Sequence, residues 1–341
     1  MELKVNQLKQ LDETLFDLPF DQFSRQAHVR AIIEGSKEIS GIRKYKILDV
    51  GGYKGATEAF HKNDDVVIAD VQKVKDVKNY IELSGSALPF EDESFDIVVS
   101  FDTFEHIPQK DRKHFINELY RVSKRGVLLA APFDDTAKNV SRAEVRLNDF
   151  HKKLYKKSHR WLKEHIEYVI PSASKLEKQL EDNSIPFVYM NTNELKIWTQ
   201  LQMMLFSIEL DTDLRGRIDD INRYYNRHLE KIDVQDEGRA YYRRIYLLWK
   251  DGSLRDSAAT YMNRLKTRAV DLESEIELFA FASETMGIKY RDVVNHRDYL
   301  ENEVVSRDET IKTLRNELES GFAHRVVKKM GNQRKKIIKR R

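Results

Sequence analysis

Cysteine is absent from the 341 residues, which excludes disulfide scaffolds, Cys-ligated zinc sites and thiol nucleophiles. Proline and glycine are sparse, at 6 and 13 residues, which excludes collagen-like and low-complexity chains. No apolar run approaches the roughly 18–20 residues that cross a bilayer. The first residues, Met1–Asn6, lack the apolar segment of a secretory signal. These absences lead us to expect a soluble, cytoplasmic protein.

Charge is abundant and unevenly distributed. Charged residues make up 34% of the chain, against about 25% in a typical globular protein. The last acidic residue is Glu319, and nine Lys or Arg residues follow Gly321. The first 321 residues therefore carry 50 basic and 56 acidic side chains. This pattern indicates a basic arm attached to a mildly acidic body.

Short apolar runs alternate with amphipathic stretches from about residue 46, as in parallel strands that helices cover on both faces. The expected strands are 47–50, 66–69, 97–99, 126–130, 187–190 and 244–249, with one more strand ending before residue 86. Helices are expected at 111–123, 174–180, 194–210 and 215–232. The predicted fold class is α/β, with a doubly wound, mostly parallel sheet.

The pattern also suggests how the chain is divided. We expect an N-terminal helical segment over 1–43, a core over 44–210, a helical insertion over 211–240, a last core strand over 241–252, a helical extension over 253–321 and a basic tail over 322–341. Five apolar residues of the extension have a heptad-like spacing: Leu300, Val304, Ile311, Leu314 and Leu318. The seam is too short to establish a coiled coil, and homo-oligomerisation stays open.

A glycine-rich turn follows the strand at 47–50, in the run from Lys46 to Thr57. Glycine is needed where the backbone turns sharply or where a ligand lies against it. Asp70 lies 21 residues after Asp49, at about the distance where an acid binds the ribose hydroxyls of an adenosine-containing ligand. By itself the turn is equally compatible with a strand–helix connection that binds nothing.

The wider pattern covers residues 45–135. Its motifs are Ile47-Leu48-Asp49-Val50-Gly51-Gly52, Ser86-Ala87-Leu88-Pro89-Phe90, Glu93-Ser94-Phe95-Asp96-Ile97-Val98 and Phe104-Glu105-His106-Ile107. This pattern resembles the class I S-adenosylmethionine-dependent methyltransferases, especially their small-molecule and glycan branch. The resemblance implies a Rossmann-like fold and S-adenosyl-L-methionine as cofactor. NAD is a weaker alternative, because the Gly-x-Gly-x-x-Gly fingerprint is absent.

The resemblance also implies where the cofactor binds. Asp49 would face its ammonium group, the turn would hold its methionine part, and Asp70 would bind its ribose through charge-assisted hydrogen bonds. The implied cofactor-binding residues are Asp49, Gly51, Gly52, Tyr53, Gly55, Asp70, Val71, Ser86, Ala87, Leu88, Ser100 and Phe101. Tyr53 replaces the middle glycine of the family, and Ser86 stands where an Asp often reads the adenine. Both changes are expected to weaken binding without preventing it.

Methyl transfer to a hydroxyl needs an aligned acceptor and benefits from a base. We select His106, His165 and Glu164 as candidate catalytic residues. For His106 the alternative is a helix-start histidine bonded to Glu105 or to the backbone. The run from His159 to Pro171 resembles a Trp-Leu-x-Glu-His…Pro segment of methyltransferases encoded beside bacterial glycosyltransferases. Its spacing places Trp161 and His165 on one helical face, which is equally compatible with a covering helix.

Three further features leave alternatives open. Glu164, His165 and Asp149-Phe150-His151 offer metal ligands, but their spacing is not diagnostic, so we expect no resident metal. The insertion is rich in Arg and Tyr, which is compatible either with binding of an anionic acceptor or with a solvated helix face. The basic tail is compatible with docking on a partner or on a membrane, in the second case as a peripheral protein at the inner membrane face. A disordered tail is the alternative. Nucleic acid is disfavoured, because stacking aromatics are lacking.

The resulting functional expectation is a methyltransferase of class EC 2.1.1. Its acceptor is expected to be a sugar or glycan hydroxyl in bacterial polysaccharide biosynthesis, as implied by the resemblance. The alternatives are methylation of a small metabolite or lipid, and a non-catalytic scaffold built on a cofactor domain.

Overall fold

The computed structural model describes residues 11–52, 56–72, 79–83, 87–212, 214–236, 238–268 and 271–338. The chain forms two compact units, Met1–Thr285 and Met286–Arg341. The sheet and all the sites considered below belong to the first unit. Predicted cofactor residues Tyr53, Gly55 and Ser86 lie outside the described residues.

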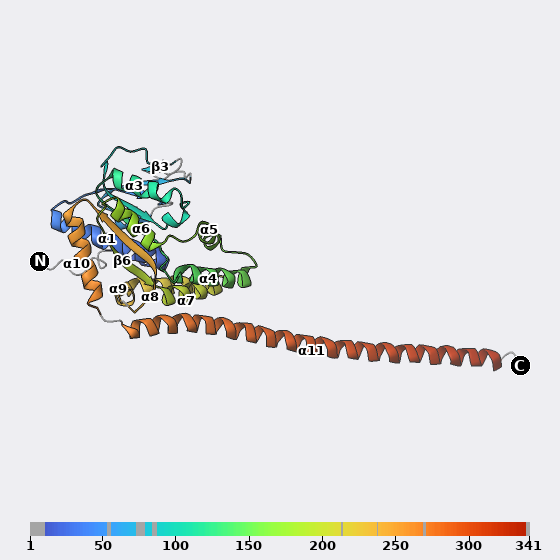
Figure 1. Cartoon of the computed structure of the whole chain (residues 1–341). Coiled ribbons are helices and arrows are strands. Elements are labelled where there is room, and N and C mark those ends of the chain that lie inside the picture. The colour runs from blue at the N-terminus through green and yellow to red at the C-terminus, as the bar shows by residue number, and fades with distance from the viewer. Residues whose placement is uncertain are drawn as a thin grey trace. The chain divides into compact units, whose positions relative to one another are not determined.

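Seven strands form a single sheet in the order β3-β2-β1-β4-β5-β7-β6 (Figure 1). The strands are β1 (Lys46–Val50), β2 (Asp65–Asp70), β3 (Tyr80–Glu82), β4 (Phe95–Phe101), β5 (Ser123–Pro132), β6 (Phe187–Glu194) and β7 (Tyr241–Trp249). Strand β7 pairs antiparallel with both β5 and β6, and the other pairs are parallel. The predicted α/β class is confirmed, and the arrangement matches a Rossmann-like methyltransferase fold.

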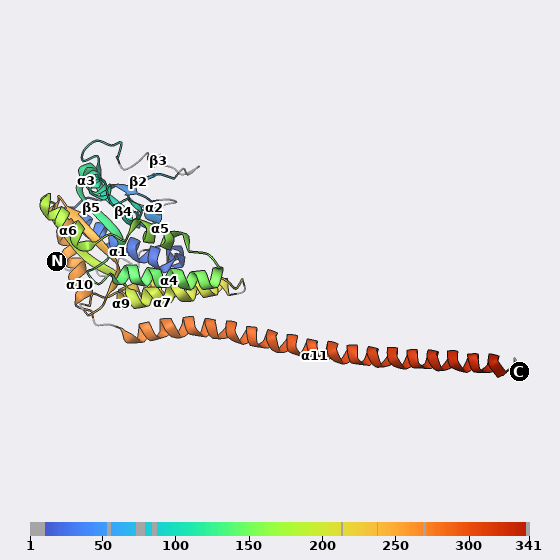
Figure 2. The same cartoon turned by 45° about the vertical axis from the view of Figure 1, so that its right-hand side comes forward.

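Helices cover both faces of the sheet (Figure 2). On one face, α1 (Phe20–Ser40) and α10 (Gly252–Lys266) pack against side chains such as Ile47, Ile97 and Leu247. On the other face, α3 (Arg112–Val122) and α6 (Ala173–Asp182) pack against Leu48 and Val98. Neighbouring residues of one strand thus enter opposite cores, because successive side chains of a strand point to opposite faces.

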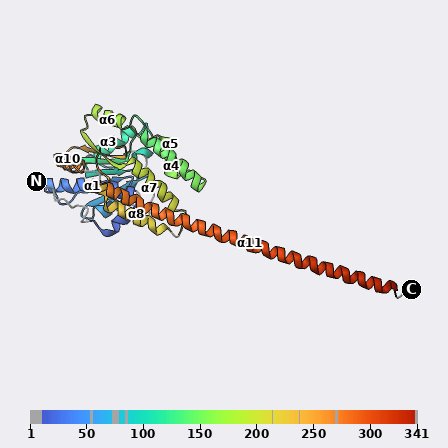
Figure 3. The ribbon, with the colours of Figure 1, turned by 90° about the horizontal axis from the view of Figure 1, so that it is seen from below.

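The remaining helices gather beside β6 and β7. They are α4 (Asn139–Tyr155), α5 (Arg160–Tyr168), α7 (Leu195–Ile208), α8 (Arg215–Arg227) and α9 (Leu229–Ile232); the short elements are η2 (Glu13–Asp17), α2 (Ala56–Phe60) and η3 (Phe104–His106). Helix α4 packs against both α5 and α7, and Figure 3 shows α4 and α5 next to each other. The sequence patterns gave no prediction for α4, and the helix expected over 215–232 is interrupted at His228.

Two arginines in the second half of α8 pair with acidic residues of η2. Arg223 pairs with Asp17 of η2, and Arg227 pairs with Glu13 at 2.5 Å. Tyr225 is buried, and Tyr224 donates a hydrogen bond to Glu277 at 2.8 Å. These contacts favour the interpretation of α8 as a packed helix with a solvated face over that of an anion-binding lid.

The last helix, α11, runs from Leu272 to Ile338, so the first part of the predicted basic tail is helical. The five predicted seam residues lie on it with exposed fractions between 45% and 69%, and the coiled coil stays a prediction. Among the helices of the described residues, none is both long and apolar enough to cross a membrane.

Candidate active site

Three carboxylates end neighbouring parallel strands at one edge of the sheet. Asp49 lies near the end of β1, Asp70 ends β2, and Asp102 directly follows β4. Strands β2, β1 and β4 are adjacent and parallel, so their carboxyl ends meet. Ligands of open α/β sheets bind outside this edge. The fold therefore brings the predicted cofactor acids Asp49 and Asp70 to the same edge.

The two glycines after β1 stand where a side chain has no room. Gly51 has a φ of +85°, and a Cβ on it would lie 2.0 Å from the Thr103 hydroxyl oxygen. A Cβ on Gly52 would lie 2.2 Å from the Asp49 carboxylate. The chain needs glycine at Gly51 for both conformation and space. The backbone of the turn is therefore held directly against Thr103 and Asp49.

The Asp49 carboxylate is buried beneath this turn. Its Oδ2 accepts a hydrogen bond from the Thr57 hydroxyl at 2.6 Å, and Gln26 in turn donates to Thr57. Its Oδ1 is buried without a hydrogen-bond partner among the described residues. Burial raises the pKa of Asp49 to about 7, against the opposing hydrogen bond from Thr57. An unpartnered buried carboxylate oxygen fits a cationic ligand group, such as the ammonium of the predicted cofactor.

The other predicted cofactor residues on β2 and after β3 differ in exposure. Asp70 is 5% exposed, and its Oδ1 accepts a hydrogen bond from the backbone of Gln72 at 2.7 Å. Val71 is 64% exposed and Ala87 is exposed. Leu88 packs in the core that contains α3, so its side chain is less available to a ligand than predicted.

The predicted residues at the end of β4 are engaged in the sheet. Ser100 is fully buried, and its hydroxyl donates to the carbonyl oxygen of Val50 at 2.9 Å. Phe101 is 6% exposed and belongs to the core on the α1 side. Ser100 thus ties β4 to β1, which positions the glycine turn.

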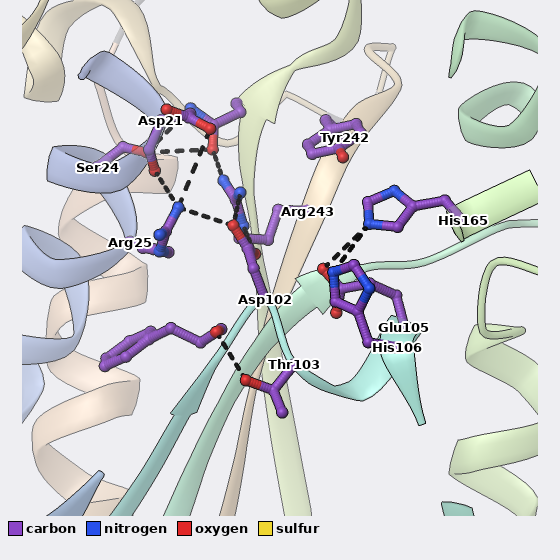
Figure 4. Close-up of polar contacts among 12 residues, drawn as sticks. Asp21, Ser24, Arg25, Asp102, Thr103, Glu105, His106, His165, Tyr242 and Arg243 are labelled. Carbon is purple, nitrogen blue, oxygen red and sulfur yellow. Dashed lines mark hydrogen bonds and ion pairs between the residues drawn. The ribbon is translucent and has the colours of Figure 1, made fainter. Parts of the chain in front are cut away.

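Two histidines from distant parts of the chain face one another (Figure 4). The Nε2 atoms of His106, in η3, and His165, in α5, are 3.3 Å apart. The Nδ1 of His106 lies 3.2 Å from Glu164, and the Nδ1 of His165 lies 2.8 Å from Glu144. The fold therefore brings together all three predicted catalytic residues. One alternative had the His106 side chain bonded to Glu105, but its Nδ1 pairs with Glu164 instead.

Further buried or half-buried side chains surround this pair, and of these the sequence motifs had included Glu105 alone. Glu105 is 1% exposed; one carboxylate oxygen lies 3.9 Å from the His165 Nε2, and the other has no hydrogen-bond partner among the described residues. The Tyr242 hydroxyl donates to Glu144 at 2.8 Å, and its ring stacks on Trp198. Beside them, Figure 4 shows Arg243 and Arg25 directed at Asp102.

The pKa values of the two histidines move in opposite directions. Burial and the neighbouring His165 lower the pKa of His106. Burial opposes the charged form of His165 as well, but Glu144 and Glu105 outweigh it and raise the pKa of His165 to about 9. Burial and the charge of Asp102 raise the pKa of Glu105 to about 8. The cluster therefore retains a positive charge between its carboxylates at neutral pH.

The structure separates two other groups of residues that the sequence analysis had grouped together. Trp161 is 61% exposed whereas His165 is buried, so the two residues of α5 share a helix but not an environment. His151 has its Nδ1 next to the carbonyl oxygen of Lys157, and Asp149 pairs with Lys152 at the surface. Asp149 and His151 therefore do not converge on one point as metal ligands would.

Comparisons with known proteins identify part of this region. A family model described as a methyltransferase domain matches residues 58–131. No curated protein matches the sequence closely enough to count as a relative.

Solved structures include chains that are similar to this one, and three of them follow. The YcgJ protein of Bacillus subtilis shares 18% identity over 65% of this chain and 98% of its own, with a TM-score of 0.38. A putative sarcosine dimethylglycine methyltransferase of Galdieria sulphuraria shares 16% identity over 64% of this chain and 84% of its own, with a TM-score of 0.39. An N-methyltransferase of Haemonchus contortus, solved with S-adenosylhomocysteine, shares 13% identity over 64% of this chain and 52% of its own, with a TM-score of 0.36.

The family match spans β2, β3, β4, α3 and most of β5, the part of the sheet that carries Asp70 and His106. The glycine turn at Gly51 and Gly52 lies just before the matched residues. Residues 58–131 are therefore similar to a methyltransferase domain, and S-adenosylmethionine is the cofactor of that family.

Proposed function

We propose that the protein transfers the methyl group of S-adenosylmethionine to a hydroxyl group of a sugar or glycan. The observation that carries the proposal is the position of the His106–His165 cluster at the sheet edge that also bears Asp49 and Asp70. When bound, the cofactor supplies an electrophilic methyl group on a good leaving group. The rest of the reaction is alignment of the acceptor and removal of its proton.

The cofactor half of the site is assigned to four residues. Gly51 and Gly52 let the methionine part lie on the backbone of the turn, because neither carries a Cβ. Asp49 presents its unpartnered oxygen to the ammonium group. Asp70, at the end of β2, binds the ribose diol.

The acceptor half is assigned to the histidine cluster. The His106 side chain is 29% exposed, whereas that of His165 is 7% exposed, so His106 is the member that an acceptor reaches first. Glu164 holds the Nδ1 side of the His106 ring. In this proposal His106, whose pKa is lowered, receives the proton of the acceptor hydroxyl as the carbon–oxygen bond forms.

The choice of a sugar rests on the resemblance of the segment from His159 to Pro171 and on one exposed aromatic. Trp161 lies one helical turn before His165 on α5 and is 61% exposed. An exposed indole offers an apolar face with a polar edge, which suits the stacking of a sugar ring.

The basic tail adds a second proposal about location. We infer that residues 322–341 hold the protein on an anionic membrane surface, where a lipid-linked glycan would be available. The nine Lys and Arg residues past Gly321 are the support for this inference.

Methyl transfer with a radiolabelled cofactor tests the proposed acceptor. The full chain is incubated with separate fractions of nucleotide sugars, lipid-linked glycans, free lipids and small amines. We expect label in a sugar-containing fraction, as an alkali-stable methyl ether. Label found exclusively in lipids or small metabolites would assign the enzyme to another acceptor class. Cofactor binding without any transfer would favour the non-catalytic scaffold.

A further inference from the structure

The two facing histidines and Glu105 present their ligand atoms to a common point. One atom each from Glu105, His106 and His165 lies within 4.8 Å of the others. The two Nε2 atoms are 3.3 Å apart. In a tetrahedral zinc site, two ligands at about 2.0–2.1 Å from the metal stand about 3.3–3.4 Å from each other. The spacing of the two rings is therefore the spacing of two ligands of one ion.

The outer nitrogen of each ring is already held by a carboxylate. Glu164 lies against the Nδ1 of His106, and Glu144 against the Nδ1 of His165. An ionised carboxylate can only accept, so each Nδ1 carries the hydrogen in this arrangement. Once the proton that the cluster holds at neutral pH is displaced, each neutral ring points the lone pair of its Nε2 at the other ring. Carboxylate–histidine pairs of this kind orient metal-bound imidazoles.

Glu105 adds a third acceptor to the same point. Its side chain is 1% exposed; its Oε1 lies 3.9 Å from the Nε2 of His165, and its Oε2 has no hydrogen-bond partner among the described residues. A buried carboxylate oxygen without a partner is costly unless a cation or a donor satisfies it. Two lone pairs and a carboxylate that face each other require either a proton or a metal ion between them.

Further contacts hold the residues behind the three ligands in place. The Tyr242 hydroxyl donates to Glu144, and the Tyr242 ring lies 3.6 Å from that of Trp198 in a stacked pair. Arg112 donates to the backbone carbonyl oxygens of Glu105 and Val169, which ties η3 to the end of α5. Segments 59 residues apart in the sequence are thus fixed against each other at the ligand positions.

A second group of similar composition shows the contrast. Glu34, His61 and Asp64 also bring three ligand atoms together. There the Lys37 ammonium lies 2.8 Å from Glu34 and 2.6 Å from Asp64, so a side-chain cation already occupies the centre. In the first group the nearby Arg25 and Arg243 pair with Asp102 instead.

We propose that His106, His165 and Glu105 form a binding site for one divalent transition-metal ion of the zinc type. Imidazole ligands favour such ions over Mg²⁺ or Ca²⁺. With three protein ligands, one position stays open for water or an acceptor oxygen. The presence of the ion is independent of the proposed function, while its role rests on it. With the ion bound, the two histidines are ligands and not bases. The ion would bind the acceptor hydroxyl and lower its pKa, and the hydroxyl proton would pass to water.

Cobalt binding to the full chain tests the site without relying on activity. The chelator-treated protein is titrated with Co²⁺, whose visible d–d absorption reports tetrahedral nitrogen and oxygen ligation. We expect one Co²⁺ per chain, displaced by equimolar Zn²⁺ and not by millimolar Mg²⁺. Absence of stoichiometric absorption would mean that a proton fills the position, and it would overturn the proposal.

Variants locate the ion. His106→Ala and Glu105→Gln should weaken Co²⁺ binding at least 10-fold, and Glu164→Gln about 10-fold, the effect expected for an outer carboxylate. His114→Ala, in an exposed histidine of α3, is the matched control and should bind as the wild type. Equal binding by His106→Ala and the control would place the ion elsewhere and overturn the assignment.

Folding of the variants is measured in parallel. Circular dichroism establishes that each variant is folded, and thermal melting gives a second readout of binding. Zn²⁺ should raise the Tm of the wild type and of His114→Ala but not that of His106→Ala. Loss of cofactor binding in the same samples, measured by calorimetry, would point to a failure of the methyltransferase proposal and not of the metal site.

Discussion

Arg243 forms a two-point ion pair with Asp102 across the sheet. Its Nε lies 2.7 Å from one carboxylate oxygen and its terminal nitrogen 2.6 Å from the other. Arg243 is 1% exposed on β7, and Arg25 of α1 reaches the same carboxylate at 2.7 Å. The pair fixes the loop that leads from β4 to His106, so three distant segments meet at Asp102.

Replacing Arg243 by methionine leaves Asp102 with Arg25 as its remaining cation. We expect a loss of about 2–3 kcal/mol in the free energy of unfolding, below the ~3–5 kcal/mol of a fully broken buried pair. Arg244→Met is the matched control, because Arg244 is partly exposed and pairs with Glu177; it should cost about 1 kcal/mol or less. Urea unfolding compares the two, and equal losses would contradict the role of the buried pair.

The glycine turn is predicted to tolerate no side chain at Gly51. Gly51→Ala combines a left-handed backbone with a Cβ only 2.0 Å from Thr103. Gly41 has a similar φ of +73° but nothing within 4 Å of an added Cβ, so Gly41→Ala isolates the backbone strain, about 1 kcal/mol. We expect Gly51→Ala to lose at least twice as much stability in urea unfolding and to lose cofactor binding. Similar stabilities would show that the turn shifts freely.

Asp70 is predicted to bind the cofactor ribose. Asp70→Asn should weaken S-adenosylmethionine binding by about 1.5–3 kcal/mol, because a charge-assisted contact is lost. Asp65→Asn is the control: Asp65 begins the same strand at the opposite edge of the sheet and pairs with Lys44 at the surface. Calorimetry measures both affinities. Unchanged binding by Asp70→Asn would remove this residue from the cofactor site.

Cofactor binding should depend on the pH through Asp49. The folded protein holds this carboxyl with a pKa raised from 3.8 to about 7 by burial, so it is mostly protonated at pH 6. The ammonium of the cofactor pairs with the ionised form. Affinity should therefore rise as the pH increases from about 6 to 7.5, and this rise should be absent in Asp49→Asn. An equal pH profile in the variant would exclude the contact.

The tail is predicted to bind anionic lipid. Deleting residues 322–341 should abolish co-sedimentation with phosphatidylserine vesicles and leave the affinity for S-adenosylmethionine unchanged. Each basic residue near such a surface contributes about 1 kcal/mol, so the effect should fall with salt. Neutral vesicles serve as the control. Persistent binding by the truncated chain would locate the contact elsewhere.

The parallel strands were predictable because each is a short run of apolar, often β-branched residues. Helix α4 was not, for a physical reason. Its buried positions include Val140 and Leu147, but also Glu144, Asn148 and His151. Polar residues at these positions hide the helical period of hydrophobicity. What buries them is the tertiary hydrogen-bond network, which local patterns do not contain.

The same limit applies to the candidate site. Asp49, Asp70 and His106 follow strands and belong to recognisable motifs. Glu144 lies on the unpredicted helix, and Tyr242 and Arg243 lie at the start of β7, within the expected last strand, where no motif singled them out. The patterns placed Glu164 next to His165, but the contact of Glu164 with His106 depends on how α5 packs against η3. Such pairings follow from topology and not from spacing.

The position of β7 sets an order of events during synthesis. This strand is the last of the seven to be translated, yet it lies between β5 and β6. Strands β5 and β6 do not pair with each other in the sheet. The position between them is therefore filled only after residue 249 has left the ribosome. The nascent chain can pair the strands that bear Asp49 and Asp70 early, while Tyr242 and Arg243 join the other half of the sheet only after β7 has emerged.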